Sequence, residues 1–205
     1  MEQHVVRQLT HPDILEALDA HAEEFDFLLV PGFKNSGPEH WQSFWERDVG
    51  GFNRISQRRW DQRDIELWID AISRSLSDCN HPAILIGHSL GALASACVIA
   101  QKNPDVVGAM FVAPAEPLRF EAEDRIPMER LCVPTSLVAS HNDNLLRFSR
   151  ARHFADTWGS DFVDLGEAGH INSEAGFGRW PYGLTILVEL CDRIKLEQES
   201  LVSAV

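Results

Sequence analysis

Residues 87–91 read Gly-His-Ser-Leu-Gly and fit the pattern G-x-S-x-G. The apolar residues 83–86 before this motif predict a strand, and the alanine- and leucine-rich residues 90–102 after it predict a helix. A sharp turn between the two would strain the backbone of Ser89 and expose its hydroxyl, while the glycines let strand and helix approach closely. The helix N-terminus would favour the negative charge that develops on a reacting carbonyl. Residue types and spacing therefore indicate a nucleophilic serine.

A serine hydroxyl is a weak nucleophile and needs a base, which in turn needs an acid to orient it. On a strand–turn–helix motif of this kind, the acid and then the histidine follow the serine along the chain. The histidines that lie well beyond the motif are His141, His153 and His170. We favour His170, which follows the last predicted strand in a glycine-containing loop, whereas His153 falls inside a predicted helix.

The candidate acids are Asp143, Asp161 and Asp164. Asp143 comes just after the predicted strand at 135–139, whereas the other two belong to or border a weaker strand at 161–165. We favour Asp143, whose alternative role is to cap the helix that follows it. On this assignment the histidine accepts the proton of the serine, and Asp143 holds the imidazole in the required tautomer.

A tetrahedral oxyanion needs two backbone donors, for which we expect the N–H groups of Leu90, at the start of the helix, and Phe33, in the loop after the opening strand. His88 lies inside the motif but is expected to point away from the nucleophile and to pack. His40 and Trp41 could line the pocket or begin an amphipathic helix, and we assign them to the core.

The elements that position these residues follow from the hydrophobic pattern. Four apolar runs predict buried parallel strands, and two weaker runs predict two more: 25–30, 83–86, 106–113 and 135–139, then 53–56 and 161–165. Helical periodicity falls at 64–76, 90–102, 148–158 and 184–196. The alternation of strand and helix predicts an α/β fold with a doubly wound sheet and helices on both faces.

Residues 1–24 are expected to form an N-terminal extension, for which a helix is one possibility, and residues 25–205 a single domain. The segment 114–134 separates two strands and is too short for an independent lid. We therefore expect no large cap domain and an open, shallow site.

The composition excludes several classes of partner. Lys and Arg number 18 against 31 Asp and Glu, and the formal charge of −13 disfavours nucleic acid and anionic lipid. The four cysteines and nine histidines show no metal-ligand spacing, so neither a metal nor an organic cofactor is expected. No apolar run could span a bilayer and no secretory signal is visible, which makes the cytoplasm the expected compartment.

The sequence resembles the small α/β-hydrolase-fold serine hydrolases, a family that includes retinoblastoma-binding protein 9 and uncharacterised bacterial members. The similarity covers about residues 25–195, and its marks besides the serine motif are the segments 28–32, 36–42 with Trp45, 139–143, 169–172 and 176–181. The resemblance implies a three-layer fold with a mostly parallel sheet of about six strands. It also implies Ser89 as nucleophile, Asp143 as acid and His170 as base. Pro31-Gly32 departs from the His-Gly of many α/β hydrolases.

We therefore expect an enzyme that hydrolyses small-molecule carboxylic esters through an acyl-enzyme intermediate. Hydrolysis of amides or peptides uses the same triad and is the first alternative. A non-catalytic protein-binding scaffold is the second, because a fold alone does not determine a function. The presence of all three triad residues argues against the scaffold.

Overall fold

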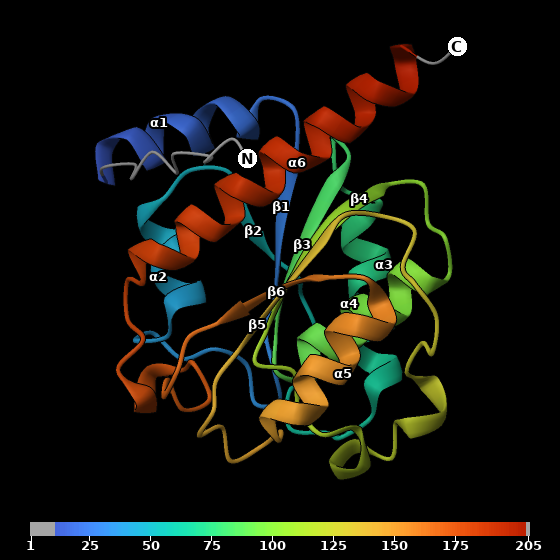
Figure 1. Ribbon diagram of the computed structural model, residues 1–205. Helices are drawn as coiled ribbons and strands as arrows, with labels where there is room; N and C mark the ends of the chain where they lie inside the picture. The colour runs from blue at the N-terminus through green and yellow to red at the C-terminus, as the bar shows by residue number, and fades with distance from the viewer. Residues whose placement is uncertain (1–10, 204–205) are drawn as a thin grey trace, which may run out of the picture.

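The computed structural model describes residues 11–203 and contains one sheet of six parallel strands (Figure 1). The strands are β1 (Asp26–Val30), β2 (Phe52–Arg54), β3 (Ala83–His88), β4 (Val106–Val112), β5 (Thr135–Ala139) and β6 (Asp161–Asp164). Their spatial order is β2-β1-β3-β4-β5-β6, so the direction of winding reverses between β1 and β3. In such sheets, ligands bind beyond the carboxyl ends of the strands at the point of reversal.

Six α-helices lie on the two faces of the sheet and complete three layers, as predicted (Figure 1). They are α1 (His11–Ala22), α2 (Trp41–Asp48), α3 (Ile65–Leu76), α4 (Leu90–Ala100), α5 (Phe148–Trp158) and α6 (Pro181–Ser203). Helices α3, α4 and α5 cover one face and share a core with Leu85, while α1, α2 and α6 cover the other and share a core with Ile84 and Ile86. Both faces are thus buried, which explains why the central strands are continuous apolar runs.

Several element limits differ from the predicted ones by one or two residues, the buried β3 and α4 included, and those of α6 differ by more. The edge strands β2 and β6 are only partly buried and shorter than expected. Helix α6 extends in both directions beyond 184–196. It begins at Pro181, a residue that suits a first helical turn, and it continues past 196, where polar residues leave no apolar stripe from which to predict a helix. Only two short 3₁₀ turns, η1 (Pro117–Phe120) and η2 (Glu123–Arg125), lie within 114–134, and residues 11–203 contain no large cap.

The segment predicted as an N-terminal extension contains α1, whereas residues 1–10 lie outside the described residues. Ile14 and Leu18 of α1 are buried in the core on the α6 side of the sheet. Within residues 11–203, no helix combines the length and apolarity that a membrane span requires.

The packing of α6 against β4 of the sheet gives a testable prediction. A Cβ added to Gly108 of β4 would lie 2.4 Å from Cδ1 of Ile194. Gly108→Ala should therefore lower the free energy of unfolding by about 1–3 kcal/mol, measured by urea denaturation. Ile194→Val removes the clashing methyl, so the double variant should lose less than the sum of the two single losses.

The control is Gly178→Ala, because the nearest atom to the added Cβ there is at an ordinary contact distance of 3.5 Å. Simple addition of the Gly108→Ala and Ile194→Val effects would mean that α6 does not pack on β4 in this way.

Candidate active site

Ser89 occupies the turn between β3 and α4 in a strained conformation, with φ 56° and ψ −119°. The glycines on either side are required by close contacts. A Cβ on Gly87 would lie 2.6 Å from Cα of Ala92, and one on Gly91 would lie 2.1 Å from the carbonyl oxygen of Val30. Non-glycine residues rarely adopt positive φ, and such strain clusters at functional sites.

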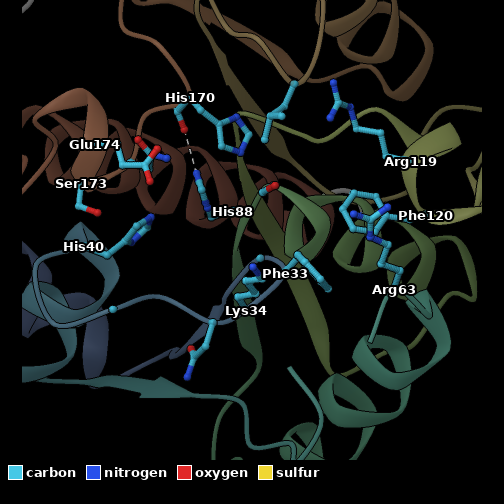
Figure 2. A pocket seen from close by; sticks show the side chains of 16 residues that line it. Phe33, Lys34, His40, Arg63, His88, Arg119, Phe120, His170, Ser173 and Glu174 are labelled. Atoms are coloured by element: carbon cyan, nitrogen blue, oxygen red, sulfur yellow. Dashed lines mark hydrogen bonds between the residues drawn. The ribbon is translucent and has the colours of Figure 1, made fainter. Parts of the chain in front are cut away.

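A cavity of about 390 Å³ opens beyond the carboxyl ends of β1 and β3, where the strand order reverses (Figure 2). Ser89 and His170 both line it. Gly32, in the loop after β1, packs against the serine so closely that a Cβ would lie 2.8 Å from Cβ of Ser89. The structure therefore brings three segments that are distant in sequence to one cavity.

His170 and Asp143 form a buried pair. Nδ1 of His170 lies 2.8 Å from Oδ2 and 3.1 Å from Oδ1 of Asp143, and their side chains are 8% and 4% exposed. Oδ1 of Asp143 also accepts the N–H of Leu145 at 2.8 Å, so this residue supports a turn rather than capping α5. Because a carboxylate only accepts, Nδ1 carries the hydrogen and Nε2 of a neutral ring is left as an acceptor.

Nε2 of His170 is buried and has no hydrogen-bond partner within residues 11–203. The hydroxyl of Ser89 likewise makes no hydrogen bond at its helix terminus. Hydrogen bonds between a catalytic base and its nucleophile are often long when no substrate is bound, and they shorten when substrate binds. The arrangement can therefore supply a nucleophile and an oriented base.

The His170 loop is held by donors from two other elements. Nε2–H of His88 donates to the carbonyl oxygen of His170 at 3.0 Å (Figure 2), and Nε1–H of Trp41 donates to the carbonyl oxygen of Ile171 at 3.0 Å. Burial lowers the pKa of His88 well below its usual range, and the neighbouring His40 adds to this effect. His88 is thus a neutral donor that anchors the loop, and it also lines the cavity of Ser89, a position that the sequence did not indicate.

Ser140 and Asn142 tie the loop of the acid to the loop of the histidine. Oγ of Ser140 accepts the N–H of Ala168 at 2.9 Å and donates to Oδ1 of Asn142 at 2.8 Å. The same amide oxygen accepts the N–H of Gly169 at 2.7 Å. Both side chains lie in the segment 139–143 that carries the resemblance, but their sequence position alone does not indicate this role.

The alternative acids and bases lie elsewhere. His141 pairs with Asp164 at 2.9 Å, Asp161 pairs with Arg193, and His153 is exposed on α5. None of these side chains lines the cavity that contains the serine.

The two expected oxyanion donors lie beside the serine. Leu90 is the first residue of α4, so its N–H has no acceptor within the helix. Phe33 directly follows Gly32, the residue in contact with Ser89. Nε1–H of Trp68 holds this loop by donating to the carbonyl oxygen of Pro31 at 2.7 Å.

His40 is buried and also lines the cavity. It caps α2, where its Nδ1 accepts the N–H of Gln42 at 3.2 Å, and its Nε2 has no partner among the described residues. Burial lowers the pKa of His40 to about 3, and Arg54 and His170 contribute. The sequence therefore predicted only one of the two surroundings of His40: the side chain is buried in the core, and it also lines the cavity.

Within the part of the chain that the structure describes, no group of three or more His, Cys, Asp or Glu side chains could hold a metal ion.

Known proteins resemble this chain in sequence and in fold. The family model described as serine hydrolase matches residues 27–189. A YdeN-like hydrolase from Pectobacterium atrosepticum is 50% identical, with a TM-score of 0.87, and the match covers 89% of this chain and 98% of that one. No curated protein sequence matches.

Two more distant structures share the fold. The ydeN gene product of B. subtilis is 16% identical with a TM-score of 0.65, and the match covers 82% of this chain and 98% of that one. Mouse alpha/beta hydrolase domain-containing protein 10 is 15% identical with a TM-score of 0.62, covering 84% and 90%.

The neutral state of His40 predicts a pH dependence of stability. Its pKa falls from 6.5 in the unfolded chain to about 3 in the fold, so the unfolded state binds the extra proton between these values. Stability from His40 is complete above pH 6.5 and is lost as the pH falls toward 3. Between about pH 7.5 and about pH 5.5 the loss should be about 1 kcal/mol.

Urea unfolding of the wild type and of His40→Asn at both pH values measures this loss. Asn keeps an oxygen that can accept the N–H of Gln42 but does not titrate. The slope of the free energy of unfolding against pH should be smaller in the variant, by the equivalent of about one bound proton. His153→Asn is the control, because His153 is exposed on α5. Equal pH dependence in wild type and His40→Asn would contradict a neutral His40.

Proposed function

Because this chain belongs to the serine hydrolase family, we propose that it hydrolyses small-molecule carboxylic esters with Ser89 as nucleophile, His170 as base and Asp143 as acid. The observation that carries the proposal is the buried pair of His170 and Asp143 at the cavity that His170 and Ser89 line, with Nε2 of the imidazole unpartnered among residues 11–203. A surface ion pair would not need this burial. Nε2 of His40 is also unpartnered among the described residues, but of these two histidines only His170 pairs with a buried carboxylate.

In the first half of the proposed reaction, Oγ of Ser89 forms a bond to the ester carbonyl carbon and its proton passes to Nε2 of His170. The carbonyl oxygen becomes an oxyanion that accepts hydrogen bonds from the N–H groups of Phe33 and Leu90. When the intermediate collapses, the bond to the alcohol oxygen breaks and the alcohol leaves with the proton from His170. Asp143 stabilises the imidazolium between the two proton transfers.

In the second half, water replaces the alcohol. His170 accepts a proton from the attacking water, whose oxygen bonds to the acyl carbon, and returns it to Oγ of Ser89 when the acyl bond to the serine breaks. The products are the carboxylic acid and the free serine. No step needs a metal or an organic cofactor.

The size and openness of the site support small esters as substrates. A cavity of about 390 Å³ falls in the range of small-molecule sites, and residues 114–134 contribute only residues of the short turn η1 to its lining. Amides have poorer leaving groups than esters and need more accurate protonation of the departing nitrogen. We therefore propose esters before amides or peptides. The proposed compartment is the cytoplasm, which suits the four cysteines, all free and all among the described residues.

A fluorophosphonate probe tests the nucleophile. The wild type should be labelled, because an activated serine attacks the phosphorus and forms a stable adduct, whereas Ser89→Ala should remain unlabelled. Ser173→Ala is the matched control, because Ser173 also lines the cavity but has no proposed role in the chemistry. Labelling is read by gel fluorescence and intact mass. Equal labelling of wild type and Ser89→Ala would contradict the proposal, and no labelling of the wild type would favour the non-catalytic scaffold.

A substrate panel tests the reaction class. Chromogenic esters of graded acyl length should be hydrolysed with the highest kcat/KM for short chains, and aminoacyl amides should react at least about tenfold more slowly. Ser89→Ala, measured with each substrate, corrects for contaminating activity. A preference for the amides would replace the ester proposal with the amidase alternative.

A further inference from the structure

Basic side chains gather at the cavity of a chain that is acidic overall. The formal charge is −13, yet Lys34, Arg63 and Arg119 line the cavity against a single carboxylate, that of Glu174. These three cations take part in none of the ion pairs found among residues 11–203. Several arginines elsewhere do pair with carboxylates: Arg47, Arg54, Arg125, Arg179 and Arg193.

The charges in the cavity are also separated. Arg63 and Arg119 lie on the side of Phe120, whereas Glu174 lies across from them beside Ser173 (Figure 2). We call Arg63 and Arg119 the arginine wall. An anion in the cavity would be attracted by the arginine wall and repelled by Glu174, so its orientation would be defined.

Aromatic rings and a backbone carbonyl help to position the arginine wall. The guanidinium carbon of Arg63 lies 5.5 Å from the centre of the Phe33 ring, and this ring packs edge-on against Phe120 with centres 6.0 Å apart. Nη2 of Arg119 donates to the carbonyl oxygen of Asn144 at 3.4 Å. These contacts use part of each side chain and leave other guanidinium N–H groups available for a ligand.

A carboxylate is the chemical group that this arrangement fits. Guanidinium groups present parallel N–H donors whose spacing matches the two carboxylate oxygens, and such charge-assisted bonds are stronger than neutral ones. The net negative charge of the chain repels anions at long range, so local cations are needed to hold one. A neutral ester has no group that would pair with these two charges.

We propose that the substrate is an ester that bears a free carboxylate, which the arginine wall binds while the ester carbonyl lies at Ser89. This inference rests on the proposed ester hydrolysis. It adds a specificity site formed by Arg63, just before α3, and Arg119, on η1.

Two para-nitrophenyl esters of equal acyl chain length test the inference: the valerate, which is neutral, and the glutarate monoester, which carries a terminal carboxylate. The wild type should hydrolyse the glutarate ester with the higher kcat/KM. Arg63→Gln and Arg119→Gln should each lower kcat/KM for the glutarate ester about tenfold more than for the valerate, since a charged hydrogen bond is lost. Arg74→Gln removes the same charge from an exposed position of α3 outside the cavity and should leave the ratio unchanged.

The outcomes separate this inference from the function on which it rests. Ser89-dependent hydrolysis of both esters, with no preference for the glutarate ester or with equal losses in the arginine variants, would overturn the carboxylate site and leave ester hydrolysis standing. If Ser89→Ala still hydrolysed the esters, or if the wild type hydrolysed neither ester, both the carboxylate site and the proposed ester hydrolysis by Ser89 would be overturned.

Discussion

The close approach of α4 to the carboxyl end of β1 is the constraint on which the site depends. Gly91 lies so near the carbonyl of Val30 that no side chain fits between them, and this contact brings the first turn of the helix directly to the sheet edge. The turn can close only if Ser89 takes a positive φ, which also lifts its hydroxyl away from strand and helix. The loop after β1 then passes alongside, because Gly32 has no Cβ to keep it at a distance. Backbone packing thus positions both the hydroxyl and the neighbouring N–H groups.

The histidine is positioned differently, by hydrogen bonds to a loop that has no regular structure of its own. His88 and Trp41 donate to carbonyls at residues 170 and 171, and Ser140 and Asn142 accept N–H groups just before them. Donors and acceptors therefore come from β3, α2 and the loop after β5. Ordering this loop before substrate arrives lowers the entropy that must be lost when the reacting groups meet. This network satisfies backbone groups on either side of the imidazole, whose Nε2 has no partner among residues 11–203.

The sequence predicted a parallel sheet of about six strands that alternate with helices, because fully buried strands such as β3 are uninterrupted apolar runs. It also predicted that there is no large cap, because the segment 114–134 is short. Edge strands and the end of α6 were harder to delimit, since their residues are partly exposed and the apolar pattern fades. The identity of Ser89, Asp143 and His170 as candidates followed from motif and order, but their mutual geometry depends on long-range packing. The buried Nε2 of His40, unpartnered among the described residues, and the presence of Arg63 and Arg119 in the lining of one cavity were not predictable, because each depends on segments that share no local pattern.

The turn η1 has a consequence for how such a fold diversifies. It supplies Arg119 and Phe120 to the cavity from the connection between β4 and β5, whereas the proposed nucleophile, acid and base all come from other connections. The proposed triad and the part of the proposed carboxylate site that η1 supplies are therefore encoded in separate stretches of chain. Laboratory evolution confined to residues 114–134 could exchange one acyl preference for another while the reactive groups stay in register.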